Sequence, residues 1–319
     1  LTTGCDKTTP AALMAAATVN LPAIVLSGGP MLDGVYKGKL AGSGMVVWEA
    51  RKLLAKGEIN YDEFMDMVAS SAPSVGHCNT MGTASSMNSV AEALGMSLTG
   101  CAVIPAPYRE REQISFETGK RIVEMVHEDL TPSKIMTKEA FENAILVASA
   151  IGASSNCPPH LTAIARHMGL ELDIENWQTI GHDIPLLVNC QPAGEHLMER
   201  FYRAGGVPAI MQELLKNNKL HKNVLTVSGK TVEENLKIKI DVDSDVIKSF
   251  ENPLVENAGY IVMRSNFFSS AVMKTSVISE EFRKRYLSNP KNKNVFEANA
   301  VVFEGPEDYH SRINDEKLN

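Results

Sequence analysis

Long apolar runs, a net positive charge and several well-known catalytic motifs are all missing from this sequence of 319 residues. No apolar run approaches the roughly 18 to 20 residues that cross a bilayer, so we expect no membrane partner. The net charge of −7 argues against a nucleic-acid partner, because phosphate binding needs a concentrated basic face. There is no Walker loop, dinucleotide fingerprint, G-x-S-x-G, H-E-x-x-H or C-x-x-C element, so those motifs offer no chemistry here.

Cysteine is also scarce, and its few positions are far apart. An odd number of widely spaced cysteines does not resemble a secreted disulfide framework, so we expect a reducing compartment and a cytoplasmic location. Some of these thiols are candidate metal ligands, and the rest are expected to be small buried apolar groups. The five positions are Cys5, Cys78, Cys101, Cys157 and Cys190.

Neither end of the sequence resembles a natural terminus. The first residue is Leu1 rather than methionine, and the last segment, up to Asn319, is charged. We therefore expect a fragment of a longer protein, from which no targeting signal can be deduced.

The hydrophobic pattern predicts an α/β fold in two parts. Residues 1–223 alternate helical stretches with short apolar strands, which indicates a layered α/β domain with a parallel sheet. Residues 224–319 contain short β-type runs between polar turns, which predicts the incomplete beginning of a mainly β, barrel-like domain. Helices are expected at 11–17, 44–55, 61–70, 81–94, 110–128, 138–150, 161–168 and 207–216. Strands are expected at 22–26, 103–104, 184–188, 225–227, 260–264, 270–275 and 299–303.

The segment 3–10 (Thr-Gly-Cys-Asp-Lys-Thr-Thr-Pro) places a thiol, a carboxylate and an amine side by side. Thr8 or Thr9 followed by Pro10 predicts a helix start with a hydroxyl N-cap. The helix dipole and free N–H groups there favour Cys5 as a thiolate. Thiolates are the usual ligands of iron–sulfur clusters.

The two residues after Cys5 suggest a second metal. A carboxylate such as that of Asp6 is a usual ligand of Mg²⁺. An ammonium group on Lys7 would repel the cation, whereas a carbamylated Lys7 would supply oxygen ligands. The alternative is purely structural: a capping aspartate, an exposed lysine and a buried cysteine.

A second cysteine occupies a similar place in the segment 76–84 (Gly-His-Cys-Asn-Thr-Met-Gly-Thr-Ala). Cys78 directly precedes the predicted helix 81–94, although a structural thiol is the alternative. Two cysteines are too few for a complete cluster, which needs about four ligand positions.

Two further loops are candidates for ligand contact. The Gly-Gly turn in 27–31 lets backbone N–H groups approach an anion, with a tight β–α turn as the alternative. In the segment 152–160, Ser155 and Asn156 could contact substrate hydroxyls, or cap the following helix. His160 is interpreted as a packed or capping histidine rather than a ligand.

Three of these segments together resemble the iron–sulfur dehydratase family, which includes dihydroxy-acid, phosphogluconate and pentonate dehydratases. The motifs are Cys-Asp-Lys-Thr-Thr-Pro at 5–10, Ser-Gly-Gly-Pro-Met at 27–31 and Gly-His-Cys-Asn-Thr-Met-Gly-Thr-Ala-Ser-Ser-Met-Asn at 76–88. The similarity extends through 92–98 and 185–189 to 204–208 and the β segment. It therefore covers the whole chain.

The resemblance implies a [2Fe–2S] cluster held by three cysteines, with one iron keeping an open position, and a neighbouring Mg²⁺. Cys5 and Cys78 match two of the cluster ligands, Asp6 matches a magnesium ligand, and Lys7 matches the lysine that is carbamylated in the pentonate branch. The third cysteine would lie before Leu1. Further acidic ligands would lie beyond both ends, and the catalytic serine beyond Asn319. No catalytic residue is therefore expected in this fragment, which alone should be inactive.

The implied activity is that of a hydro-lyase, which removes water from a sugar acid to give a 2-keto-3-deoxy acid. The segments 77–81 and 8–11 look more like the sugar-acid branch, so a pentonate or similar aldonate is the favoured substrate. Cys157 stands where the family more often has alanine, and Ser155 where it often has threonine. A homodimer or homotetramer is expected.

Other interpretations remain open. One is dihydroxy-acid dehydratase of branched-chain amino-acid synthesis, which in a eukaryote could be mitochondrial. Another is a truncated, non-catalytic relic. An electron-transfer protein is disfavoured, because its clusters need a full set of thiolates. The favoured interpretation requires that folding bring the sulfurs of Cys5 and Cys78 together, with Asp6 turned into the same cavity.

Overall fold

The computed structural model describes residues 1–288 and 299–318, and the chain divides into two compact units. The larger unit is Leu1–Val277 and the smaller is Ile278–Asn319. This division does not test the boundary expected between residues 223 and 224, which stays a prediction. Among the described residues, no helix is both long and apolar enough to cross a membrane.

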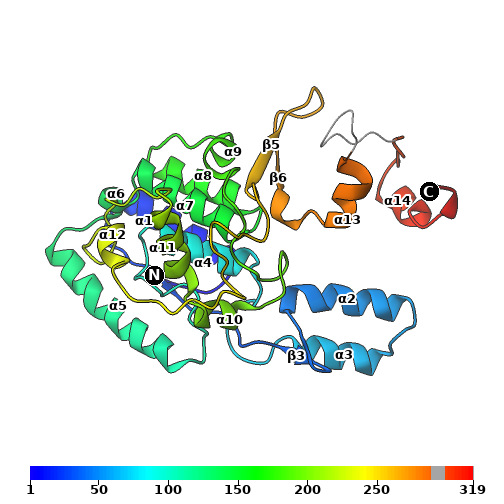
Figure 1. The fold of residues 1–319 in the computed structure, drawn as a ribbon, viewed down its shortest axis with the longest axis horizontal. Helices are drawn as coiled ribbons and strands as arrows, with labels where there is room; N and C mark the ends of the chain where they lie inside the picture. The colour runs from blue at the N-terminus through cyan, green and yellow to red at the C-terminus, as the bar shows by residue number, and fades with distance from the viewer. Residues whose placement is uncertain (289–298, 319) are drawn as a thin grey trace. The chain divides into compact units, whose positions relative to one another are not determined.

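Two helices, α4 (Thr83–Ala93) and α7 (Lys138–Ala150), pack against each other in the core of the larger unit. Every residue of α4 after Thr83 is buried, as is nearly all of α7 from Ala140 onward. Figure 1 shows further helices around this pair. They are α1 (Thr8–Val19), α8 (Cys157–His167), α9 (Asn176–Gly181) and α11 (Gly206–Lys216).

Small side chains explain how α4 can be buried on all sides. Three serines and three alanines occupy its length, so neighbouring helices approach its backbone closely. Two of the three serine hydroxyls form hydrogen bonds: Ser85 Oγ donates to the Thr80 carbonyl at 2.8 Å, and Ser86 Oγ accepts the Ser154 N–H at 2.9 Å. Met87 and Val90 are fully buried, and each contributes roughly 1.5 to 3 kcal/mol by leaving water.

The described residues form three two-stranded sheets. β1 (Thr2–Thr3) pairs in parallel with β2 (Leu26–Ser27), so Thr3 lies opposite Ser27. The other two pairs are antiparallel: β3 (Val35–Tyr36) with β4 (Lys39–Leu40), and β5 (Tyr260–Met263) with β6 (Ala271–Lys274). The predicted α/β class and a parallel pairing are confirmed, and no closed barrel forms among the described residues.

Several strand predictions are wrong. Residues 103–104 form a turn, residues 299–303 contain no strand, and of residues 22–26 only Leu26 belongs to one. The runs 184–188 and 225–227 contribute isolated bridges only. The apolar runs around Val25 and Val103 are buried in the main core, so their hydrophobicity predicted burial and not strand pairing.

Most helix predictions are confirmed. The observed elements include α2 (Ser43–Ala55), α3 (Tyr61–Ser70) and α5 (Arg109–His127), besides α1, α4, α7 and α11. α8 begins at Cys157, earlier than expected, because Pro158 and Pro159 occupy its first turn, where their missing N–H groups cost nothing. Shorter helices are α6 (Pro132–Ile135), α10 (Met198–Arg203), α12 (Val232–Asn235) and η1 (Thr275–Val277).

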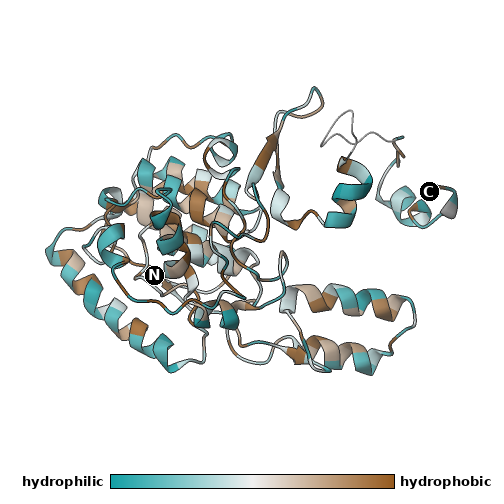
Figure 2. Cartoon of the chain, in the orientation of Figure 1, coloured by the Kyte–Doolittle hydropathy of each residue, from teal (hydrophilic) through white to brown (hydrophobic). Residues whose placement is uncertain are grey.

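α2 and α3 form a hairpin with a small core of its own, separate from the main one. Val46, Ala50 and Met67 are buried between the two helices. Asn60 starts α3 with a capping box, in which Asn60 and Glu63 each accept the other's backbone N–H. Figure 2 shows apolar and polar residues interspersed along both helices, as expected when only one face of each is buried.

The smaller unit consists of short helices. They are α13 (Glu280–Phe282), η2 (Arg283–Leu287), α14 (Pro306–Arg312) and η3 (Glu316–Leu318). Within it, the rings of Phe303 and Tyr309 meet edge to face with centroids 5.2 Å apart, and Arg312 pairs with Asp308.

Candidate active site

The segment that carries Cys5 forms a turn immediately before α1. The helix is preceded by Lys7 as N-cap residue, without a side-chain cap, so the predicted threonine cap is wrong. Thr8 Oγ1 instead accepts the N–H groups of Gly4 at 3.2 Å and Cys5 at 3.0 Å, and donates to the Cys5 carbonyl. The hydroxyl therefore holds the cysteine in place from inside the first helical turn.

Cys5, Asp6 and Lys7 are all accessible at this turn: Cys5 is an exposed free thiol. Lys7 Nζ lies 3.3 Å from Asp6 Oδ2, and this hydrogen bond holds the pKa of Asp6 below its ordinary value. The two side chains are 65% and 45% exposed, so the ion pair contributes less than about 1 kcal/mol. A cation or a carbamylation reaction can therefore displace it at little cost.

Cys78 is half-buried among hydroxyl groups. Its Sγ lies 2.8 Å from Ser43 Oγ at the start of α2 and 3.2 Å from Thr80 Oγ1. A Cβ on Gly44 would lie 3.8 Å from this sulfur, so glycine leaves room beside the thiol. Such a polar, uncrowded setting suits a thiolate ligand better than a buried structural thiol.

Cys78 does not directly precede α4, as the sequence suggested. Four residues, 79–82, separate it from the first helical residue, Thr83. Asn79 holds this turn, since its Oδ1 accepts the Ser43 N–H at 2.9 Å and its Nδ2 donates to the Leu32 carbonyl. The thiol is thus placed by side-chain contacts with α2 rather than by the dipole of α4.

His77, next to Cys78, is buried and neutral at pH 7. Burial lowers the pKa of His77 to about 4. Its Nδ1 lies 3.0 Å from the Cys78 carbonyl, which can only accept, so Nδ1 carries the proton. Its Nε2 therefore accepts from Asn88 Nδ2, at 3.4 Å.

The two cysteine segments meet at residues 27–30, which we call the site loop. The Gly28 N–H donates to the Thr3 carbonyl at 2.6 Å, two residues before Cys5. The His77 N–H donates to the Gly29 carbonyl at 3.0 Å, one residue before Cys78. The site loop therefore fixes the main chains of both segments.

Asn88, on α4, provides a second link between the same segments. Its Oδ1 accepts hydrogen bonds from Thr3 Oγ1 at 3.1 Å and Thr9 Oγ1 at 3.3 Å. Its Nδ2 contacts His77, as described above. The structure thus brings the two cysteine segments together and encloses neither thiol in an aliphatic core; direct proximity of the two sulfurs stays a prediction.

The segment with Ser155 and Asn156 reaches the N-terminus of α4. Asn156 Nδ2 donates to Thr83 Oγ1 at 2.8 Å, and the same Thr83 oxygen lies 2.8 Å from Ser154 Oγ. The Asn156 side chain makes no cap bond to α8. Both Ser155 and Asn156 are exposed, so they are free to meet a ligand, and their substrate role stays a prediction.

His160 lies near the turn that carries Cys5, Asp6 and Lys7. α1 and α8 pack together, and their C-terminal ends meet where Thr18 Oγ1 lies 2.7 Å from His167 Nδ1. His160 is two turns before His167 on the same face. Burial lowers the pKa of His160, and the charge of Lys7 adds to this while that of Asp6 opposes it. Its Nε2 is buried without a hydrogen-bond partner among the described residues. A polar ligand at this turn would satisfy it, which fits a metal or substrate site.

Comparison with known proteins assigns the family. Residues 1–235 match the model of the dihydroxy-acid/6-phosphogluconate dehydratase N-terminal domain. Residues 245–319 match the corresponding C-terminal domain. The chain belongs to the dihydroxy-acid/6-phosphogluconate dehydratase family.

Individual members of this dehydratase family differ in similarity. A D-xylonate dehydratase of Caulobacter vibrioides is 60% identical over the whole chain, and an L-arabinonate dehydratase of Rhizobium leguminosarum is 45% identical over the whole chain. A dihydroxy-acid dehydratase of Acetivibrio thermocellus is 40% identical over 97% of it. The chain spans 53%, 53% and 55% of these proteins, about half their length.

The remaining cysteines of this dehydratase-family chain are structural, as expected. Cys101, Cys157 and Cys190 are buried, and burial raises the pKa of each, that of Cys157 to about 12. Among the described residues, no group of three or more His, Cys, Asp or Glu side chains is arranged to hold a metal ion.

Two residues far along the sequence support the Ser155 segment and were not anticipated. Lys274 Nζ, on β6, donates to the Gly152 carbonyl at 2.5 Å, and burial lowers the pKa of Lys274 to about 8. Tyr260 Oη, on β5, donates to the Ala153 carbonyl at 2.7 Å. More than one hundred residues separate each pair, so no spacing in the sequence could reveal them.

Proposed function

We propose that this chain is the metal-binding part of a hydro-lyase that converts a sugar acid, such as a pentonate, into a 2-keto-3-deoxy acid. Family membership and the similarity to proteins named D-xylonate and L-arabinonate dehydratase support it. The structural observation that carries it is the convergence of the Cys5 and Cys78 segments on the site loop. If the fold buried these two thiols far from each other, they could not bind a common metal cluster.

In this proposal Cys5 and Cys78 hold a [2Fe–2S] cluster, and Asp6 with carbamylated Lys7 holds Mg²⁺. These metals, when bound, supply Lewis acidity that acidifies the C2 proton and helps the 3-hydroxyl leave. The chain contributes two thiols, which is fewer than the cluster needs, so the third cluster thiol comes from outside residues 1–319.

The chain's own residues prepare the site electrostatically. Ser43 and Thr80 can donate hydroxyl hydrogen bonds to the Cys78 sulfur when it ligates a metal. The N-terminus of α1 favours negative charge at Asp6.

The exposed Ser155 and Asn156 are proposed to orient the substrate through hydrogen bonds to its hydroxyl groups. A hydrogen bond to Thr83 holds Asn156 in place, and a hydrogen bond from Lys274 to the Gly152 carbonyl holds the start of the segment. The base that removes the C2 proton is proposed to lie outside residues 1–319, so this chain alone is expected to be inactive.

The test uses the complete gene product, purified without oxygen. We expect 2-keto acid formation from D-xylonate or L-arabinonate, and much less from 2,3-dihydroxyisovalerate. Faster turnover of 2,3-dihydroxyisovalerate would favour the branched-chain amino-acid enzyme instead. Absence of both activity and bound iron would support a non-catalytic relic.

Variants assign the ligands. Cys5→Ser and Cys78→Ser should each lose bound iron and the visible absorption of the cluster, whereas Cys157→Ala, which changes a buried structural thiol, should keep both. Full iron content in either serine variant would contradict the assignment.

A further inference from the structure

Arg111 is an unusual residue in the first turn of α5, because its charged side chain is buried. It is 7% exposed, and burial lowers its pKa. Among the described residues it forms no ion pair. Its guanidinium instead donates to main-chain carbonyls: Nη1 to Ser27 at 2.6 Å, and Nη2 to Cys101 at 2.9 Å and to Ile104. Burying a charge in this way is unfavourable unless its hydrogen bonds are made, so the position needs an explanation.

The carbonyls that accept from Arg111 either belong to the site loop or come from the neighbouring segment 101–104. Ser27 is the first residue of the site loop, and the Ala106 N–H, just after Ile104, donates to the Pro30 carbonyl at 2.9 Å. A Cβ on Gly29 would lie 2.9 Å from Arg111 Nη2 and 2.8 Å from the Ala106 nitrogen. The guanidinium therefore packs directly against the loop to which both cysteine segments are hydrogen-bonded.

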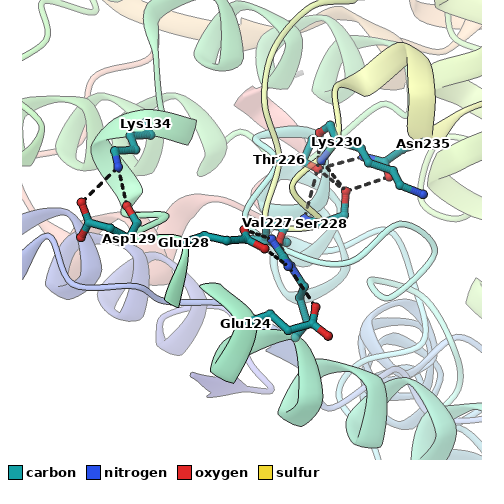
Figure 3. A network of polar contacts seen from close by, with 10 residues as sticks. Glu124, Glu128, Asp129, Lys134, Thr226, Val227, Ser228, Lys230 and Asn235 are labelled. Carbon is teal, nitrogen blue, oxygen red and sulfur yellow. Dashed lines mark hydrogen bonds and ion pairs between the residues drawn. The ribbon is translucent and has the colours of Figure 1, made fainter. Parts of the chain in front are cut away.

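Arg121, ten residues further along α5, is a natural control. Its side chain is also largely covered, at 11% exposed, and Nε donates to the Val227 carbonyl at 2.7 Å. Glu124 and Glu128, however, pair with its charge, and Figure 3 shows both beside Val227. Among the residues that the structure describes, the loop 226–230 forms no hydrogen bond with either cysteine segment.

We propose that Arg111 is a positioning residue of the candidate active site: its guanidinium fixes the site loop and so sets the placement of Cys5 relative to Cys78. A planar fork reaches carbonyls in several directions at once, which a lysine ammonium on a single stem does not. The link to cluster binding rests on the proposed function, but the effect on the loop can be measured without any metal.

The test compares Arg111→Lys with the matched Arg121→Lys in the complete gene product, by hydrogen exchange of the metal-free protein. In Arg111→Lys, the amides in 27–31 and 76–79 should exchange about ten-fold faster or more. The reason is that the hydrogen bonds from the guanidinium, which hold the site loop in place, are lost. Amides in 226–230 should not change. Arg121→Lys should show the reverse pattern. Unchanged exchange in 27–31 and 76–79 of a folded Arg111→Lys protein would overturn the proposal.

A second readout concerns the cluster. Iron release to a chelator should be accelerated in Arg111→Lys and unchanged in Arg121→Lys. If the wild-type protein binds no iron, the proposed function fails, whereas the exchange experiment still decides the role of Arg111.

A milder variant covers the case in which Arg111→Lys does not fold. Ser27→Ala removes the hydroxyl that donates to the Ala102 carbonyl at 3.0 Å and accepts the Gly29 N–H at 3.2 Å. It should speed exchange in 27–31 and 76–79 by about three-fold or more, because both of these hydrogen bonds are lost. Global unfolding of Arg111→Lys, together with unchanged exchange in Ser27→Ala, would make Arg111 a general fold residue and contradict the proposal.

Discussion

The two ends of α5 accommodate the charge of a largely buried arginine in different ways. Both carry an arginine that holds the main chain of a neighbouring loop. Near the start, Arg111 is surrounded by carbonyls and its loop supports both cysteine segments. Toward the end, Arg121 is neutralised by the half-exposed Glu124 and Glu128. The first arrangement depends on a particular buried geometry, while the second depends on charge pairing that water and salt can replace.

Glycine repeats the same contrast. Gly29 lies under Arg111 with φ +86°, and Gly229 lies beside Arg121 with φ +78°. A Cβ on Gly29 would meet the backbone of Ile104 and Ala106, whereas one on Gly229 would meet only the tips of the Arg121 and Glu128 side chains. The site loop at Gly29 therefore tolerates an added Cβ less well than the loop at Gly229 beside Arg121.

The largest expected effect is that of Gly29→Ala. Overpacking against backbone and an unfavourable positive φ should together cost roughly 4 kcal/mol of unfolding free energy. Gly229→Ala should cost about 1 kcal/mol, because its φ is equally unfavourable but side-chain tips can move. Urea unfolding of both variants provides the measurement, and equal costs would break the comparison.

Glu92, near Arg111, should make the stability of the fold depend on pH. It accepts the N–H groups of Gly100 and Ala102 beside Arg111, and burial raises its pKa to about 7. The folded state therefore binds a proton more tightly than the unfolded state, so stability should fall by about 3 kcal/mol as pH rises from about 4.5 to 7. Glu92→Gln should remove this slope in unfolding curves measured across that range.

Glu128, which pairs with Arg121, should give a pH dependence of stability of the opposite sign to that of Glu92. Its hydrogen bond from Arg121 lowers the pKa of Glu128, so the stability it contributes is present above its unfolded pKa and is lost on acidification. Because Glu128 is at the surface, Glu128→Gln should alter stability only slightly. A fall in stability toward neutral pH that depended on Glu128 rather than Glu92 would contradict this assignment.

Two asparagines offer a smaller contrast. Asn88 links Thr3, Thr9 and His77, so Asn88→Ala leaves buried groups unpaired and should cost about 2 kcal/mol. Asn235, which Figure 3 shows with Thr226 and Ser228, is only half-buried, and Asn235→Ala should cost about 1 kcal/mol or less. Thermal unfolding compares the two, and a larger cost at Asn235 would reverse the ranking.

Salt should produce the smallest effect. Arg121→Met should cost about 1 kcal/mol at low ionic strength, and less at high ionic strength, because ions screen the pairs with Glu124 and Glu128. The cost of Arg111→Met should hardly depend on salt, since its partners are buried carbonyls. Denaturation at two salt concentrations measures both, and equal salt dependence would count against the distinction.

The sequence named the candidate site residues, but not the contacts that hold them in place. Cys5, Asp6, Lys7 and Cys78 are recognisable because each motif is local, and their roles as ligands stay predictions. Arg111 and Asn88 could not be identified in this way, since their partners lie up to 85 residues away in the chain. Such contacts arise only when α4 and α5 pack against the site loop.

Local signals also misled at particular points. Thr8 looks like an N-cap before Pro10, yet the helix begins one residue earlier and the hydroxyl bonds to the Cys5 backbone. Ile24 and Val25 look like a strand because they are apolar, but they are buried in the main core without belonging to a strand. At these two residues hydrophobicity predicted burial correctly, whereas the choice between strand and buried loop depends on partners elsewhere in the fold.

The most direct measurement is chemical bridging of the two thiols in the metal-free gene product. A short bifunctional reagent such as dibromobimane, followed by peptide mass spectrometry, should link Cys5 to Cys78 in the native protein. Cys101, Cys157 and Cys190 should stay unmodified until denaturant is added. Single labels on Cys5 and Cys78 without any bridge between them would show that the site loop does not bring the two thiols together.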